Sequence, residues 1–226
     1  MSTVSGGQGN IVTTGLVLNL DAANPRSYAP PFNGTTWQNI APVSSSLTGS
    51  LVGGVAYTGS NSGALVFDGI NDYVNLGNTP ATQFPNTSPW SFSITTELLS
   101  QNTLYPGILV KGNHSSTGLL VFYYSSGSIV LKHNNQQPNA FVVSMNRPFM
   151  YTVTYAGSGT AKVYLNGLYR AEGPPMAGVD TTSNLLLGVG DSYSNIRVYN
   201  FTKYNRELNP SEVLQNFNAT RARFGI

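Results

Sequence analysis

Cysteine is absent from this 226-residue chain, so neither a disulfide framework nor a thiolate metal site can form. A chain of this length buries roughly 70% of the surface that it exposes when unfolded, so its core needs no covalent cross-link. The length suits one large all-β domain as well as two small ones. Because no linker or change of composition interrupts the chain, we expect a single folded domain.

Charged residues are also scarce, at 9% of the chain against about 25% in a typical soluble domain. Eleven basic and nine acidic residues leave a formal charge of +2, which excludes the broad basic surface of a general nucleic-acid-binding protein. No apolar run approaches the roughly 18 residues that a membrane span needs. We therefore expect neither nucleic acid nor a membrane as a partner. Apolar residues still amount to 40%, enough to form a core.

Side chains that could carry catalysis are few and scattered. A retaining glycosidase needs two carboxyl groups about 5 Å apart, which on a strand means acids at alternate positions. The four glutamates show no such pairing: Glu97, Glu172, Glu207 and Glu212. Two histidines, His114 and His133, are too few for a multi-histidine zinc site, and their polar neighbours predict that both are solvated. "GVGDSY" lacks the third glycine and the helix of a dinucleotide-binding motif. We expect no catalytic residue and no cofactor.

Alternation of apolar and polar residues is the dominant pattern in what remains. It recurs in "GLVLNLD", "SFSITTEL" and "FMYTVTY", and clusters of Gly, Pro, Asn and Ser separate such runs. Asn166-Gly167 predicts a two-residue hairpin turn, because both turn positions adopt positive φ. That turn sets Leu165 opposite Leu168 and Tyr164 opposite Tyr169. Many short strands at short spacing predict an all-β fold of two antiparallel sheets, a jelly-roll sandwich.

One segment near the end, "NPSEVLQNFNATRARF", predicts a short C-terminal helix. Asn209 suits the N-cap and Pro210 the first helical position, while Glu212 can reach back to complete a capping box. Basic residues close the segment, where the helix dipole favours cations. We expect the side chains of an apolar stripe to pack on a sheet: Val213, Leu214 and Phe217.

The stretch "FDGINDYVNL" at residues 67–76 has two readings. Asp68, Gly69, Asn71 and Asp72 favour a tight turn, through side-chain bonds to the backbone and tolerance of positive φ. The same oxygens could hold calcium, but calcium needs six to eight ligands. Another loop would have to supply the rest, for instance through Asp21 or Asp191. Turn chemistry alone accounts for every residue of the stretch, so we expect a turn and no bound metal.

Four segments in this order resemble the concanavalin A-like, laminin-G-like jelly roll: "GLVLNLDAANPRSY", "ALVFDGINDYVNLGN", "YTVTYAGSGTAKVYLNGLY" and "VYNFTKYNRELNPSEVLQNFNATRARFGI". The last is similar to versions found in tailed-phage virion structural proteins. The resemblance covers residues 15–226 and leaves residues 1–14 as a flexible N-terminal arm. It implies two curved antiparallel sheets, with a carbohydrate or protein ligand on the concave face or edge loops. Some members bind calcium, but no complete ligand set is evident here.

The resemblance implies a non-catalytic virion structural protein, decorating a capsid, neck or tail through contacts with other virion proteins. We expect a homo-oligomer within that assembly. The start "MSTVSGGQGN" lacks the basic and apolar regions of a secretory signal, which favours assembly in the host cytoplasm and a location in the virion. The alternative is a lectin-like adhesin or tail-fibre module that binds host-surface glycans. Exposed aromatic side chains such as Trp37, Tyr105 or Tyr193 would then stack on sugars, although core packing is the other reading for Trp37 and the expected one for Trp90.

The chain ends in "RARFGI", which places cations beside apolar side chains. A free terminus usually frays unless something holds it. We therefore expect contacts with a neighbouring subunit at four residues: Arg221, Arg223, Phe224 and Ile226. The alternative is that Phe224 and Ile226 fold back on their own sandwich.

Overall fold

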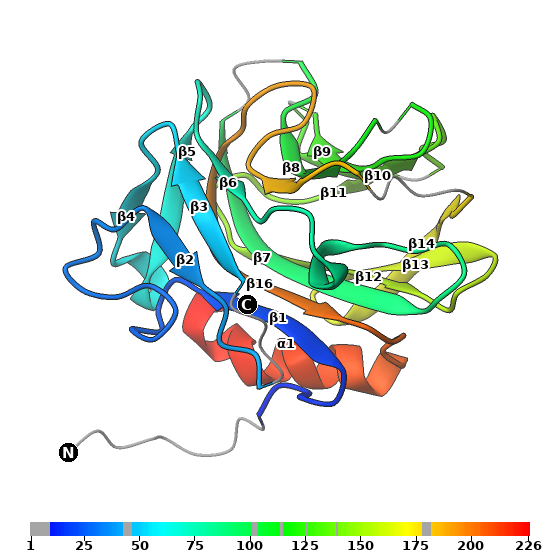
Figure 1. Ribbon diagram of the computed structural model, residues 1–226, viewed down its shortest axis with the longest axis horizontal. Helices are drawn as coiled ribbons and strands as arrows, with labels where there is room; N and C mark the ends of the chain where they lie inside the picture. The colour runs from blue at the N-terminus through cyan, green and yellow to red at the C-terminus, as the bar shows by residue number, and fades with distance from the viewer. Residues whose placement is uncertain are drawn as a thin grey trace.

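The alternating segments pair into two antiparallel sheets, each of eight strands within the described residues (Figure 1). The computed structural model describes residues 10–42, 47–100, 104–113, 115–124, 126–138, 140–177 and 182–226. Sheet A runs in the order β14 (Leu168–Pro175), β13 (Thr160–Leu165), β12 (Phe149–Tyr155), β7 (Trp90–Ser100), β16 (Asn195–Tyr204), β5 (Ala64–Asp68) and β4 (Ala56–Thr58), with β1 (Leu16–Asp21) also on β16. Sheet B runs in the order β11 (Ala140–Val142), β10 (Ser128–His133), β9 (Leu119–Tyr123), β8 (Gly107–Lys111), β15 (Leu185–Leu187), β6 (Tyr73–Asn75), β3 (Thr48–Val52) and β2 (Thr36–Gln38).

The described parts of the chain also contain three helical segments: η1 (Ser60–Ser62), η2 (Pro80–Thr82) and, after the last strand, α1 (Pro210–Phe224). The fold is thus the expected two-sheet sandwich with one C-terminal α-helix: alternation predicted the sheets, and the capping residues predicted the helix. No helix of the described residues is long and apolar enough to cross a membrane.

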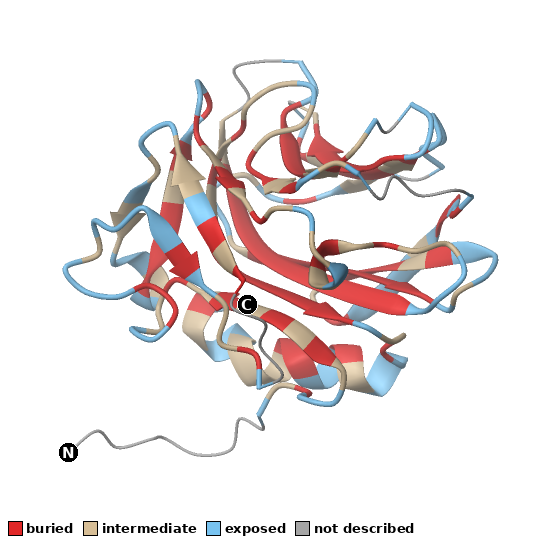
Figure 2. Cartoon of the chain, in the orientation of Figure 1, coloured by how far each residue is buried: buried red, intermediate tan, exposed pale blue. Residues whose placement is uncertain are grey.

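The main hydrophobic core lies between the two sheets. Strand β7 is central to sheet A, and every residue from Trp90 to Leu98 is buried (Figure 2). Phe92 and Ile94 point into the core, while Ser93 and Thr95 occupy the other face. Both faces are covered because α1 lies along the outer side of sheet A, below β1 and β16 in Figure 1. The polar and the apolar residues of β7 are therefore both buried, although they alternate in the sequence.

The hairpin at Asn166-Gly167 is confirmed. Asn166 and Gly167 have φ of 52° and 77°, and β13 pairs with β14 so that Tyr164 faces Tyr169 and Leu165 faces Leu168. The turn lies against the helix, since a Cβ on Gly167 would come within 2.9 Å of the Phe217 Cβ. Glycine is required here both for its φ and for this close approach.

Helix α1 begins as expected. The side chain of Asn209 accepts a hydrogen bond from the Glu212 amide at 3.0 Å, and Glu212 accepts one from the Asn209 amide at 3.0 Å. Phe217 is buried, but the prediction for Leu214 is wrong, because 39% of it is exposed. The buried face of the helix includes Val213, Asn216, Phe217 and Phe224, and Leu214 lies at the edge of that face beside the hairpin turn.

The expected N-terminal arm, residues 1–14, includes residues that pack on the sandwich. Val12 is buried, its amide donates to Asn216 Oδ1 at 2.8 Å, and its carbonyl accepts from the Tyr204 hydroxyl at 3.0 Å. Gln215 Nε2 also donates to the Asn10 carbonyl at 2.8 Å. The apolar pair at 11 and 12 ties residues 10–14 to the sandwich, so these residues belong to the domain. The rest of the arm, residues 1–9, lies outside the described residues.

Candidate functional site

The outer face of sheet B is the side of the sandwich that α1 leaves uncovered; β8 to β11 lie at the top of Figure 1 and α1 at the bottom. Side chains alternate along β9, so that Val121 and Tyr123 enter the main core. Leu120 and Phe122 point the other way and form a small apolar cluster with Val130 on the outer face. This face therefore has its own apolar base outside the main core.

The segment of residues 188–194, here called the 190 loop, rests directly on that base. A Cβ on Gly190 would come within 2.6 Å of Leu120 Cδ1 and 2.7 Å of the Gly107 Cα. The Ser192 hydroxyl donates to the Leu104 carbonyl at 2.7 Å, and the Ser194 hydroxyl donates to the Gly107 carbonyl at 2.7 Å. Gly190, the second glycine of "GVGDSY", lets the 190 loop pack closely on sheet B. The loop therefore forms a fixed ridge on the outer face.

A groove of about 540 Å³, here called the tyrosine groove, lies on one side of this ridge. Its floor is a row of outward-facing residues, because Leu186 pairs with Asn75 on one side and with Val110 on the other. Tyr73 and Tyr193 stand over the floor with ring centroids 6.4 Å apart. The groove is completed by Gly112, Ser183, Asn184, Val189 and Gly190.

The tyrosine groove has the composition of a site for a neutral, hydroxyl-rich ligand. None of its lining residues carries a charge. Tyrosine supplies a flat apolar ring together with a polar hydroxyl, and Asn75 and Asn184 supply amides that both donate and accept hydrogen bonds. Its volume falls within the range of small-molecule sites, which combine apolar walls with a few polar groups that orient the ligand.

A second hollow of about 180 Å³, here called the aromatic pocket, lies on the other side of the ridge. Tyr105, Phe122 and Tyr124 meet edge to face, with ring centroids 5.2 to 5.7 Å apart. Lys132, Gln137 and Asp191 complete the lining. Tyr105 adopts a positive φ of 54°, and 42% of it is exposed. This hollow differs from the groove in having a cation and an anion in its wall.

The aromatic residues expected to stack on sugars separate into two groups. Tyr105 and Tyr193 both lie on the outer face of sheet B, in the two hollows just described. Trp37 is fully buried in the main core, so core packing is the correct reading for it. Trp90 is also buried, as expected, with its ring edge to face against Phe84 at 5.0 Å and its Nε1 donating to the Pro85 carbonyl at 3.0 Å.

The C-terminal residues make contacts within the chain. The Arg223 guanidinium pairs with Asp21 at 2.7 Å and donates to the carbonyls of Asn61 and Gly63 at 2.7 and 2.6 Å. Phe224 is buried against Ala64 and Tyr199, with Ile226 partly buried beside it. Phe224 therefore folds back on its own sandwich, as the alternative reading expected. A subunit contact at any of the four residues stays a prediction, and Arg221 is exposed, over the Phe217 ring at 5.8 Å.

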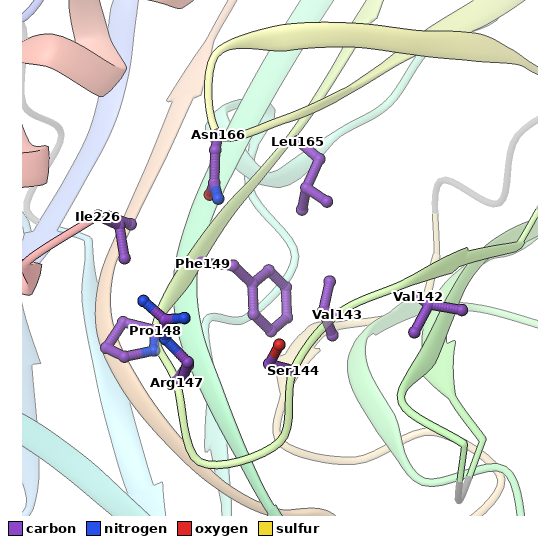
Figure 3. A pocket seen from close by; sticks show the side chains of 9 residues that line it. All are labelled: Val142, Val143, Ser144, Arg147, Pro148, Phe149, Leu165, Asn166 and Ile226. Carbon is purple, nitrogen blue, oxygen red and sulfur yellow. The ribbon is translucent and has the colours of Figure 1, made fainter.

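Ile226 also borders a pocket of about 310 Å³ at the open edge between the sheets (Figure 3). Ile226 and Val142 lie on opposite sides of it, and Phe149 and Leu165 lie between them. Val142 is 72% exposed. Ser144, Arg147 and Asn166 contribute a more polar wall.

The stretch at residues 67–76 folds as a turn. Asp68 Oδ1 accepts from the Ile70 amide at 2.8 Å, and Asp72 Oδ2 accepts from the Asp68 amide at 3.0 Å. Burial raises the pKa of the Asp72 carboxyl, the Asp68 amide opposes this, and the charge of Asp68 adds to it. Among the described residues no group of three or more His, Asp or Glu side chains could hold a metal ion. Asp21, one of the two residues named as possible helpers, pairs with Arg223.

Side chains that could act as acids or bases are engaged in structure. Glu97 accepts from Arg197 at 3.0 Å and from the Tyr199 hydroxyl at 2.6 Å. The prediction that His133 is solvated is wrong, since it is buried and its Nδ1 lies 2.8 Å from the Gly118 carbonyl. Its Nε2 accepts from the Ala177 amide at 3.1 Å, so His133 ties β10 to the segment after β14. His114 lies outside the described residues.

No family model and no curated protein matches the chain, but solved structures share its fold. The sialidase of Trypanosoma rangeli is 16% identical with a TM-score of 0.70, over 98% of this chain and 36% of the sialidase. The binding domain of Paraclostridial Mosquitocidal Protein 1 is 16% identical with a TM-score of 0.71, over 91% of this chain and 52% of that one. The receptor binding domain of botulinum neurotoxin C/D mosaic serotype is 13% identical with a TM-score of 0.68, over 91% and 51%. The chain thus spans about a third to a half of these neighbours, and the likeness establishes a β-sandwich fold.

Proposed function

We propose that this protein is a non-catalytic, lectin-like module that binds host-surface glycans through the outer face of sheet B. The observation that carries the proposal is the tyrosine groove, in which two tyrosine rings and two amides surround an uncharged floor. Sugar rings present apolar C–H faces and a rim of hydroxyls, which match aromatic faces and amides respectively.

Two further observations support this proposal. The groove lies on the sandwich face that the helix leaves uncovered, and its walls are positioned by strand pairing and by a loop packed on the sheet. The fold also recurs in proteins that bind: a toxin receptor binding domain, and a sialidase solved in complex with sialic acid. A binding module needs no acid pair, which agrees with the scattered glutamates.

A glycan array followed by titration of the bound glycans tests the proposal. Tyr193→Ala is expected to weaken binding by about 1–2 kcal/mol, the loss typical of a central aromatic contact. Tyr169→Ala is the matched control, because Tyr169 is a half-exposed tyrosine on β14, in sheet A. Equal affinity of both variants and the wild type would place the binding site elsewhere, and the absence of any bound glycan would overturn the function.

A second candidate is a virion structural role, in which the protein is assembled in the host cytoplasm and contacts other virion proteins or copies of itself. The observation that favours it is the pocket at the sheet edge, where Val142 is largely exposed and Ile226 borders a hollow with both apolar and polar walls. Because Arg223 and Phe224 hold the domain together, a test should leave them intact. Ile226→Ser and Arg221→Ala should lower incorporation into particles without lowering the melting temperature; normal incorporation of both would count against this surface.

A further inference from the structure

We propose that the ligand is an oligosaccharide that crosses the 190 loop, with an uncharged sugar in the tyrosine groove and a neighbouring sugar in the aromatic pocket. This inference rests on the proposed carbohydrate-binding function and adds the size and the charge of the ligand. It follows from how the two hollows share one ridge on one sheet face.

The two hollows lie on opposite sides of the same loop. Val189, Gly190 and Tyr193 line the groove, whereas Asp191 lines the aromatic pocket. Their floors are also continuous in the sheet, because Val110 of the groove pairs with Leu120, and Leu120 pairs with Lys132 of the pocket. A chain of sugars that leaves the groove across the loop therefore meets the pocket next.

The combined width of the two hollows exceeds one sugar. From β15, which carries Leu186, to β10, which carries Lys132, there are three strand steps in sheet B. At about 4.8 Å for each step this is roughly 14 Å, which is longer than a single pyranose ring. One sugar can occupy either hollow but cannot fill both at once, so only an oligosaccharide uses the whole face.

The charges of the two hollows limit which sugars fit. A carboxylate placed in the tyrosine groove would lose hydration without meeting a cation among the lining residues, which is costly. The aromatic pocket instead offers Lys132 as a donor and Asp191 as an acceptor, a combination suited to hydroxyl groups. The groove therefore selects a neutral sugar, and an acidic sugar such as sialic acid is disfavoured there.

The ridge is held in place before any ligand arrives. Gly107 and Gly190 approach each other so closely that a Cβ on Gly107 would come within 2.3 Å of the Gly190 Cα. The Ser192 carbonyl accepts hydrogen bonds from the Gly107 amide at 3.1 Å and from the Gly190 amide at 3.0 Å, which holds the loop against β8. A rigid ridge lowers the cost of ordering the site on binding and fixes the spacing between the two sugars.

The test uses the full chain and a set of linear neutral hexose and N-acetylhexosamine glycans of one to six units, with the sialylated form of each. The expected result is that glycans of two or more units bind at least tenfold tighter than the monosaccharide, and that sialylation of the unit in the groove weakens binding. Tyr124→Ala, in the aromatic pocket, should bring the ratio of oligosaccharide to monosaccharide affinity close to one. Tyr169→Ala should preserve that ratio. Melting curves confirm that each variant is folded.

The outcomes separate this inference from the function beneath it. Equal affinity for one sugar and for six, an unchanged ratio in a folded Tyr124→Ala variant, or tighter binding of the sialylated forms would each overturn the inference. In these cases a loss of binding in Tyr193→Ala would still support the glycan-binding function. If no glycan of either series binds the folded wild type, the function and the inference both fail.

Discussion

Lys203 is a lysine buried inside the sandwich, and replacing it with methionine is expected to stabilise the protein. Its side chain is on β16, only 2% of the residue is exposed, and Nζ lies 4.9 Å from the centroid of the Phe84 ring. Burial, with a smaller contribution from the charge of Lys111, lowers the pKa of Lys203 from 10.5 to about 7. Such a shift corresponds to roughly 5 kcal/mol of unfavourable free energy for the charged form.

Methionine has a similar length and no charge, so Lys203→Met removes most of this cost. The variant also loses the attraction between the ammonium and the Phe84 ring. We therefore expect a gain of about 1–4 kcal/mol in the free energy of unfolding at pH 6 to 7, the range seen when buried charges are replaced by apolar residues. Denaturant titration with a tryptophan or circular dichroism signal measures it.

The dependence on pH gives the sharper test. Between pH 7 and 10.5 the unfolded chain holds a proton on Lys203 that the folded chain has released, so wild-type stability from this position rises with pH, by up to about 1.4 kcal/mol per unit. Below pH 7 both states are protonated and the full cost remains. The advantage of Lys203→Met should therefore shrink between pH 7 and 9.5. Lys162→Met, at a more exposed lysine paired with Glu207, should show no such gain.

A destabilised Lys203→Met variant, or an advantage that does not change between pH 7 and 9.5, would refute this reasoning. Either result would mean that the ammonium is satisfied by water or by a charge inside the sandwich. Measuring variant and wild type in parallel cancels the titration of the tyrosines at high pH, since both proteins share them.

The remaining predictions concern the turns and the C-terminus. Gly167→Val should lower the stability by about 2–4 kcal/mol, from positive φ and the contact with the helix; Gly159→Val has a similar φ of 74° but open space around it, so equal losses would argue against the helix contact. Arg223→Lys should cost about 1–3 kcal/mol, because an ammonium cannot serve two carbonyls and a carboxylate as the guanidinium does; an unchanged melting temperature would contradict this. A calcium chelator should shift the melting temperature by less than about 2 °C, and a large drop would make Asp72 a ligand.

Local features of the sequence predicted local features of the structure well. The hairpin turn and the helix start depend on residues within five positions of one another, so Asn166-Gly167 and the Asn209–Glu212 capping box could be read directly. Trp37 could not be placed in this way, because its burial depends on strands far along the chain. Leu214 was misplaced because the stripe facing the sheet includes Asn216, which a purely hydrophobic pattern overlooks.

The candidate site was largely invisible in the sequence. Tyr73 and Tyr193 meet only because β15 inserts between β6 and β8, a strand order that no local pattern contains. "GVGDSY" was noticed only as an incomplete nucleotide motif, although its glycines mark where a backbone approaches a sheet closely. A Gly-x-Gly followed by a tyrosine between two strands is the signal that could have located the 190 loop.

The position of the helix has a consequence for how this protein would be displayed. Residues 10–14 run beside α1, and Gly225 closes it, so both described ends of the chain lie close to this helix and away from the outer face of sheet B. The glycan-binding face proposed for sheet B is on the opposite side of the sandwich (Figure 1). A carrier joined near either described end would contact the side of the domain that bears α1. The tyrosine groove would then face away from the carrier. Attachment and recognition would then be independent, and many copies could be mounted side by side without blocking one another's ligands.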